Sequence, residues 1–203
     1  MLPGTAREVV SITSAVLTLR ISEPYDARMP IVSAPFDHPD ARKLNDLVLQ
    51  EYTRRYGDPE GDATPLDPVM FQPPRGLYLL AYDDAGRPVA TGGWRAMDAA
   101  RTEAGEEDQH YEDGDAELKR MFVVPEARGQ GIARRILARL EEDAREAGRT
   151  RMVLETGVHQ PEAIALYTSS GYVPAPRKFG HYRFHEESRC YVKSLRGISD
   201  VTV

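Results

Sequence analysis

One short segment combines glycines, an arginine and the expected start of a helix in a pattern that can bind an anion. Residues 128–133 read Arg-Gly-Gln-Gly-Ile-Ala and come shortly after a β-favouring segment that ends at Pro125. Gly129 and Gly131 lack Cβ atoms, so several unpaired backbone N–H groups can converge at the helix start. A helix start carries about half a positive charge and Arg128 adds a full one, which favours an anion such as pyrophosphate.

Several known phosphate-binding loops use this arrangement, and two of them do not fit. The dinucleotide fingerprint GxGxxG needs a small third residue, where this chain has Arg134. The loop of nucleotide triphosphatases needs Lys and then Ser or Thr after its second glycine, and these are absent. What remains is Arg128-x-x-Gly131-x-Ala133, a pattern that an ordinary strand-to-helix turn also produces.

A second segment strengthens the interpretation of the first. Residues 154–172 read LETGVHQPEAIALYTSSGY. Together the two segments resemble the GNAT superfamily, the GCN5-related N-acetyltransferases. Residues 128–133 are similar to its coenzyme A pyrophosphate loop, Gln/Arg-x-x-Gly-x-Gly/Ala. The second block of the family is Asn-x-x-Ala-x-x-x-Tyr-x-x-x-Gly-Phe/Tyr, which Ala163, Tyr167, Gly171 and Tyr172 match, while Gln160 replaces the Asn.

The resemblance implies direct transfer of an acetyl group from acetyl-CoA to a primary amine, with no metal and no covalent enzyme intermediate. It also implies that the backbone at the end of the strand before the loop binds the pantetheine arm. The family's Asn often contacts that arm, so the departure at Gln160 leaves this contact open. The implied cofactor-binding residues are Phe122, Val123, Val124, Arg128, Gly129, Gln130, Gly131, Ile132, Ala133, Gln160, Ala163 and Tyr167.

The resemblance also suggests catalytic roles. Tyr167 stands where the family has a tyrosine that protonates the leaving thiolate, although a core aromatic would fit the same helix position. The attacking amine needs a base. Glu117 matches a glutamate of histone-type members, and strand alternation is expected to place Glu117, Lys119, Met121 and Val123 on one face. Glu155, with His159 behind it, is the alternative base.

Periodicity predicts one mixed sheet flanked by helices. The expected order is strand, helix, three strands, helix, strand, helix, two strands, an α/β (α+β) arrangement that fits a GNAT fold with a mostly antiparallel sheet. Residues 1–28 are expected to be an extension that adds a strand, and 29–203 to form a single domain. Leu44, Leu47, Val48 and Tyr52 are expected on the inner face of the first helix. The inner face of the second helix is expected to carry Ile132, Ile136, Leu140 and Ala144, which recur every fourth residue. Gly92 and Gly93 suggest a bulge or a close approach of the backbone. Trp94 is expected in the core, Phe71 as an anchor of segment 58–74 and Cys190 as a buried thiol.

Composition narrows the classes of partner. The chain has 203 residues, a net charge of −6 and one cysteine, which disfavours broad nucleic-acid binding and fits a reducing, cytoplasmic compartment. No apolar run reaches the roughly 20 residues that a membrane span needs. His181 and His185 are four apart, but no acid or cysteine completes a metal site nearby, so we expect surface histidines.

The acceptor is open at this point. A small amine, such as an amino acid or a polyamine-like compound, is favoured over a protein. The acidic segment 98–115, with Glu106, Glu107 and Asp108, could guide a cationic acceptor, or it could be a solvated loop. Residues 58–74 could be a substrate lid or a connector. A non-catalytic acyl-CoA sensor or interaction module and a homodimer also stay open.

Overall fold

A computed structural model describes residues 29–57, 62, 64–98 and 109–196 of the chain. The expected extension at residues 1–28 lies outside this part, as do residues 99–108 of the acidic segment. The hypotheses about an added strand and about a guide for a cationic acceptor at Glu106, Glu107 and Asp108 therefore stay predictions.

The predicted order of elements is confirmed. It runs β1 (Ile31–Ser33), α1 (Pro39–Tyr56), β2 (Gly76–Tyr82), β3 (Pro88–Met97), β4 (Asp115–Val123), α2 (Ile132–Glu146), β5 (Arg151–Gly157), α3 (Pro161–Ser169), β6 (Val173–Pro174) and β7 (Ser188–Ser194). Two short 3-10 helices, η1 (Pro68–Phe71) and η3 (Pro125–Ala127), lie in the connections. None of the helices within the described ranges is both long and apolar enough to cross a membrane.

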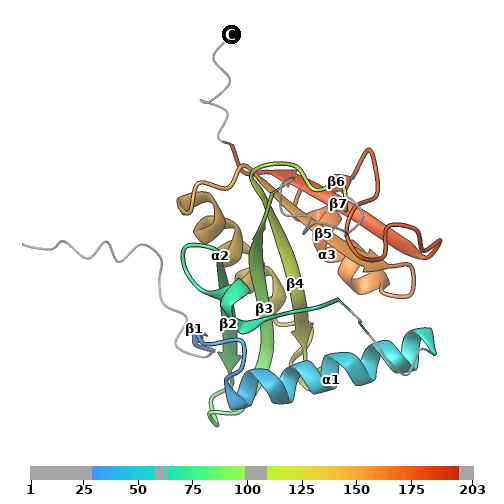
Figure 1. The fold of residues 1–203 in the computed structure, drawn as a ribbon. Helices are drawn as coiled ribbons and strands as arrows, with labels where there is room; N and C mark the ends of the chain where they lie inside the picture. Colours follow the sequence, from blue (N-terminus) through green and yellow to red (C-terminus); the bar gives the residue numbers. More distant parts are fainter. Residues whose placement is uncertain (1–28, 58–61, 63, 99–108, 197–203) are drawn as a thin grey trace, which may run out of the picture.

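The strands form one seven-stranded sheet in the order β1-β2-β3-β4-β5-β7-β6 (Figure 1). The expected mixed, mostly antiparallel sheet is confirmed, since β4 and β5 are its parallel pair, joined by the crossover through α2. Their pairing runs only from Asp115 to Glu117 on β4 and from Arg151 to Val153 on β5. Both strands continue well beyond these residues, so they part toward their carboxyl ends and leave room between them.

The two long helices pack on opposite faces of the sheet. On α2, the predicted stripe of Ile132, Ile136, Leu140 and Ala144 is buried and packs into the cluster that contains Trp94 and Leu118. On α1, Ala41 and Leu44 pack with Phe71 and Tyr78 in a second cluster. Figure 1 shows α1 crossing the face of the sheet that α2 does not cover.

One predicted core position of α1 is wrong. Leu47 is 37% exposed, whereas Leu44 and Val48 are each 1% exposed. Successive helical residues are separated by about 100°, so Leu47 lies well to one side of the stripe that Ala41, Leu44 and Val48 share.

A bulge, one of the two features expected at this glycine pair, is present opposite Gly92. It changes which face of the sheet the later side chains of β4 point to. Thr91 pairs with Phe122 and Gly93 with Lys119, so Gly92 on β3 faces two residues, Arg120 and Met121, on β4. A Cβ at Gly92 would collide with the Met121 sulfur beside Ile136 of α2. The expected alternation is therefore wrong beyond Lys119, since the extra residue turns Met121 and Val123 toward the α2 side.

Candidate active site

A groove of about 410 Å³ lies where α1, the end of β4, the start of α2 and α3 meet. Ten of the twelve predicted cofactor-binding residues line it: Phe122, Val123, Arg128, Gly129, Gly131, Ile132, Ala133, Gln160, Ala163 and Tyr167. Val124 and Gln130 are not among the lining residues, and the Val124 N–H already donates to the Val89 carbonyl at 2.9 Å. The groove therefore brings together the two sequence segments that are more than twenty residues apart.

The glycine loop opens the start of α2 toward this groove. Gly129 and Gly131 have φ angles of 78° and 76°, in the left-handed region that favours glycine, and Gly131 caps the helix without a side-chain hydrogen bond. The first bond of the helical type runs from the Arg135 N–H to the Gly131 carbonyl at 3.1 Å. The N–H groups of residues 132–134 precede it and have no helical acceptor. They are placed to receive the oxygens of an anion.

Arg128 borders the groove but is held from two sides. Its Nε donates to the Val123 carbonyl at 3.0 Å, and its Nη2 donates to Glu51 of α1 at 2.8 Å. Its guanidinium also lies 5.9 Å from the centre of the Phe122 ring. These contacts fix its positive charge beside the glycine loop.

The sequence reasoning did not assign eight further lining residues to the cofactor site: Glu51, Tyr52, Arg55, Met121, Ala127, Arg134, Glu162 and Leu166. Arg55 joins α1 to α3, since it pairs with Glu51 at 2.6 Å and with Glu162 at 3.0 Å. Arg134 donates to Ser169 and Ser170 at the end of α3. A basic residue in the first turn after the glycine loop was a usable signal for Arg134, whereas nothing local marked the α1 residues.

Gln160 and Tyr56 form one contact at the end of the groove. The Gln160 amide donates to the Tyr56 hydroxyl at 3.1 Å, and a Cβ on Gly157 would collide with the same hydroxyl. Gln160, which replaces the family's Asn, therefore uses its amide N–H in a hydrogen bond to α1, and this bond links α1 to the start of α3.

Tyr167 projects from α3 into the groove and is 6% exposed. Its ring packs edge-on against Tyr172 at 5.6 Å between centroids. Burial raises the pKa of its hydroxyl, helped by the nearby Tyr52. The hydroxyl therefore stays protonated at neutral pH and has a proton to donate.

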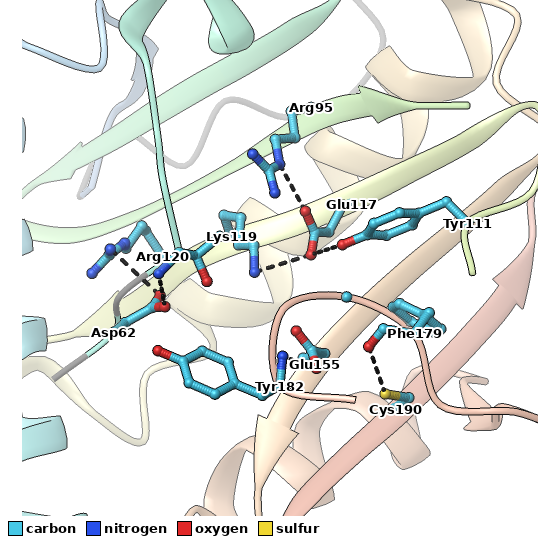
Figure 2. Close-up of polar contacts among 12 residues, drawn as sticks. Asp62, Arg95, Tyr111, Glu117, Lys119, Arg120, Glu155, Phe179, Tyr182 and Cys190 are labelled. Carbon is cyan, nitrogen blue, oxygen red and sulfur yellow. Dashed lines mark hydrogen bonds and ion pairs between the residues drawn. The ribbon is translucent and has the colours of Figure 1, made fainter. Parts of the chain in front are cut away.

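Glu117 lies at the centre of a buried polar cluster (Figure 2). Its carboxylate meets Arg95 Nε at 2.7 Å, Lys119 Nζ at 3.0 Å and the Tyr111 hydroxyl at 2.8 Å, and the side chain is fully buried. Burial alone would raise the pKa of Glu117, but the charges of Arg95 and Lys119 and the hydrogen bonds outweigh it and lower the pKa. This carboxylate is therefore stably ionised.

Glu155 lies on the neighbouring strand with the opposite character. Burial raises the pKa of Glu155 to about 7, with Lys119 opposing the rise and Glu117 adding to it. Its Oε1 accepts from the Tyr182 N–H at 3.2 Å and the Ser188 hydroxyl at 3.3 Å, while its buried Oε2 has no hydrogen-bond partner in the described part of the chain. His159, which follows Glu155 in sequence, pairs with Glu187 at 3.1 Å.

The remaining polar candidates have structural contacts. Cys190 is buried on β7 as predicted, with its thiol 3.6 Å from the Phe179 carbonyl. His181 and His185 both pack edge-on against Tyr182. In the part of the chain that the structure describes, no three His, Cys, Asp or Glu side chains form a group that could hold a metal ion.

Comparison with known proteins identifies the family of this chain and several relatives. Residues 42–172, well over half of the chain, match the model of the acetyltransferase (GNAT) family. The IAA acetyltransferase of Azospirillum brasilense is 54% identical over 61 residues, 30% of this chain and 40% of that relative. The aminoalkylphosphonate N-acetyltransferase of Salmonella typhimurium is 35% identical over 75 residues, 37% of this chain and 46% of that relative. The chain thus aligns with less than half the length of both relatives.

A solved structure supports the same assignment at the level of the whole fold. An acyl-CoA N-acyltransferase from Klebsiella pneumoniae superposes with a TM-score of 0.64 and 26% identity, over 84% of this chain and 100% of that chain. The family match includes both sequence blocks, and the superposition includes the sheet that positions them. This chain belongs to the acetyltransferase (GNAT) family.

Proposed function

We propose that this chain acetylates a small primary amine by direct attack of the amine on acetyl-CoA in the groove. The observation that carries the proposal is the meeting of the open α2 start with Tyr167 in one groove. The start of α2 can bind the pyrophosphate of coenzyme A, and Tyr167 can protonate the sulfur at the other end of the same ligand.

The lining residues suggest how the cofactor is held. The N–H groups after Gly131 and the charge of Arg128 suit the pyrophosphate. Phe122 and Val123 at the end of β4, where β5 has already parted from it, suit an extended pantetheine arm bound through the backbone. Ala133 and Ala163 contribute small side chains to the lining, which keeps the groove open.

Proton transfer needs an acid and a base, and we assign these to Tyr167 and Glu155. Glu155 takes a proton from the ammonium group, directly or through water, so that the neutral amine attacks the thioester carbon. The carbon–sulfur bond breaks, Tyr167 protonates the thiolate, and the proton lost by the attacking nitrogen restores Tyr167. A base with a pKa of about 7 suits this task at neutral pH.

Glu117, the other candidate base, is better suited to positioning. Its two oxygens are already occupied by Arg95, Lys119 and Tyr111, and its pKa is lowered. A carboxylate that is held ionised by two cations is a weak proton acceptor. We therefore give Glu117 the role of holding Lys119 and of raising the pKa of Glu155 through its negative charge.

Two observations favour a small acceptor. One relative is named for aminoalkylphosphonates and another for IAA. In addition, Arg95, Glu117, Lys119 and Arg120 are all buried, which suits a ligand that fits inside better than a protein chain.

The test is release of coenzyme A from acetyl-CoA across a panel of primary amines, with wild type and Tyr167→Phe compared. General acid catalysis contributes about 10²–10⁴ in rate, so the variant should lose at least tenfold in kcat with unchanged acetyl-CoA binding. Turnover that Tyr167→Phe leaves unchanged would reject Tyr167 as the acid. Tight acetyl-CoA binding without turnover of any amine would instead point to a sensor or to a protein acceptor.

A further inference from the structure

The β4 bulge places a second buried cation beside Lys119. Leu118 and Met121 both face α2, so Lys119 and Arg120 between them both face the α1 side of the sheet. Arg120 has a φ of 58°, which is rare for a residue with a side chain, and is 8% exposed. Strained backbone of this kind is retained mainly where function requires the side chain.

The guanidinium of Arg120 is poorly satisfied in the free protein. Its ion-pair partner among the described residues is Asp62, at 3.4 Å from Nη2. Its buried Nε and Nη1 have no hydrogen-bond acceptor among the described residues. Buried charged donors without acceptors are costly, so the site is incomplete until an anion binds. Close by, Thr64 donates its N–H to Asp62 at 3.0 Å.

The charges around this position have a positive excess. The cluster contains the cations Arg95, Lys119 and Arg120 and the carboxylates Asp62, Glu117 and Glu155 (Figure 2). Glu117 is paired with two of the cations. Because Glu155 is only partly ionised at neutral pH, three cations are opposed by two stable carboxylates, which favours a ligand with a negative group.

This cluster adjoins the proposed reaction centre. Tyr52 lines the groove, and the charges of Asp62 and Arg120 both act on its pKa, while Tyr52 in turn acts on the pKa of Tyr167. Lys119 acts on the pKa of both Asp62 and Glu155, so it lies close to both. An acceptor that reaches Arg120 at one end can therefore present its other end toward Glu155.

We propose that the acceptor is a zwitterionic amine, with a carboxylate or phosphonate that binds Arg120 and an ammonium group that faces Glu155. This inference rests on the proposed acetyl transfer and adds the class of substrate. In this proposal Arg120 determines substrate specificity. Asp62 competes with the carboxylate or phosphonate of the acceptor for the Arg120 guanidinium.

The first experiment compares amines in matched sets. α-Amino acids are tested against their primary amides, aminoalkylphosphonates against simple alkylamines, and diamines serve as cationic acceptors. We expect kcat/KM at least about tenfold higher for the anionic member of a set, as for hydrogen bonds to a charged group. The carboxylate and phosphonate arms identify which anion is used. Equal or better turnover of amides, alkylamines or diamines would overturn the proposal while leaving acetyl transfer intact.

Two variants at the site have opposite expected effects. Arg120→Met should raise KM for the anionic acceptor at least about tenfold and remove its advantage over the amide. Asp62→Asn removes the competing carboxylate with little change of shape, and should lower KM for the anionic acceptor. If the acceptor were cationic, Asp62→Asn would raise KM. Arg87→Gln, which changes an exposed arginine paired with Asp83 in the β2–β3 turn, is the control and should alter neither value.

A binding measurement tests the proposed anion site even if the protein turns over none of the amines. N-acetylated amino acids and N-acetylated aminoalkylphosphonates are titrated by calorimetry into wild-type protein saturated with coenzyme A, and into Asp62→Asn and Arg120→Met. Binding that Asp62→Asn strengthens and Arg120→Met abolishes supports the anion site even if no amine is turned over. Absence of binding to wild type and Asp62→Asn alike, or equal binding to all three proteins, would overturn it.

Discussion

Glu117 and Glu155 lie on neighbouring strands, and their surroundings move their pKa values in opposite directions. Two cations and a tyrosine hydroxyl lower the pKa of Glu117, while Glu155 has one unpaired oxygen and a pKa raised to about 7. Such a pair divides the work between one permanently charged group and one that exchanges a proton. The next two predictions test this division at single residues.

The first prediction concerns the pH dependence of the reaction. Because the base must be deprotonated, kcat should rise with pH and level off above an inflection near the Glu155 pKa of about 7. In Glu155→Gln this inflection should disappear and kcat should fall. Glu187→Gln, which changes an exposed glutamate paired with His159, is the control. An inflection that persists in Glu155→Gln would exclude Glu155 as the base.

The second prediction concerns the pH dependence of folding stability. The pKa of Glu155 in the folded protein lies above that of a free glutamate side chain, so its contribution to stability is present at low pH and is lost as pH rises through about 7. A rise from 4.5 to about 7 corresponds to about 3 kcal/mol. Urea unfolding should therefore show Glu155→Gln gaining roughly 3 kcal/mol over wild type between about pH 4 and pH 8. A difference between the two proteins that does not change with pH would contradict the assigned pKa.

At the scale of elements, the two ends of α2 offer a matched test of the glycine loop. Gly131 and Gly148 have φ angles of 76° and 80°, and neither has an atom within 4 Å of an added Cβ. Only Gly131 lines the groove. The same substitution therefore adds the same backbone strain at both ends but a methyl group in the groove at one.

We expect Gly131→Ala and Gly148→Ala each to lose about 1–2 kcal/mol of unfolding free energy, the cost of a left-handed residue with a side chain. Gly131→Ala alone should raise KM for acetyl-CoA, because its methyl group occupies the space of the anion. Denaturant unfolding and steady-state kinetics measure the two effects. Equal KM values for acetyl-CoA in both variants would show that the glycine loop does not contribute to cofactor binding.

The β4 bulge is a second feature at the scale of elements, because it changes which side of the sheet the side chains of β4 face. It changes alternation so that Lys119 and Arg120 face the same side while Leu118 and Met121 stay in the α2 core. Gly92 makes this possible, because a side chain there would collide with Met121. The strand that carries Glu117 thereby supplies three charged groups in succession to the acceptor side.

At the scale of the whole molecule, the groove joins α1, β4, α2 and α3, which are distant in sequence. A ligand that contacts all four should stabilise the folded state as a unit. At 100 times its Kd, coenzyme A should add about 2.7 kcal/mol. For a domain of this size we expect a rise in Tm of roughly 5–11 °C.

Thermal unfolding with increasing coenzyme A measures this shift, and pantetheine, which lacks the pyrophosphate, is the matched control. The rise should be several times smaller with pantetheine at the same concentration, since the helix start then has no anion to bind. Equal shifts with the two ligands would show that the glycine loop does not contribute to binding.

The sequence alone determined the order of elements, the glycine loop, the α2 core stripe and the position of Tyr167 on a helix. These depend on local periodicity, on glycine and proline, and on spacing within segments 128–133 and 154–172, which can all be read along the chain. It left the base open between Glu117 and Glu155, because the pKa of a carboxylate depends on burial and on charges from distant strands.

Only the tertiary structure decided which residues meet across the sheet. Folding brings Glu51, Tyr52 and Arg55 of α1 to the groove, and it surrounds Glu117 with Arg95, Lys119 and Tyr111. The bulge at Gly92 also overturned the simple alternation expected along β4, since one extra residue reverses every later side chain. Contacts between distant segments follow from strand register and helix packing, and neither is recorded in the spacing of residues along one segment.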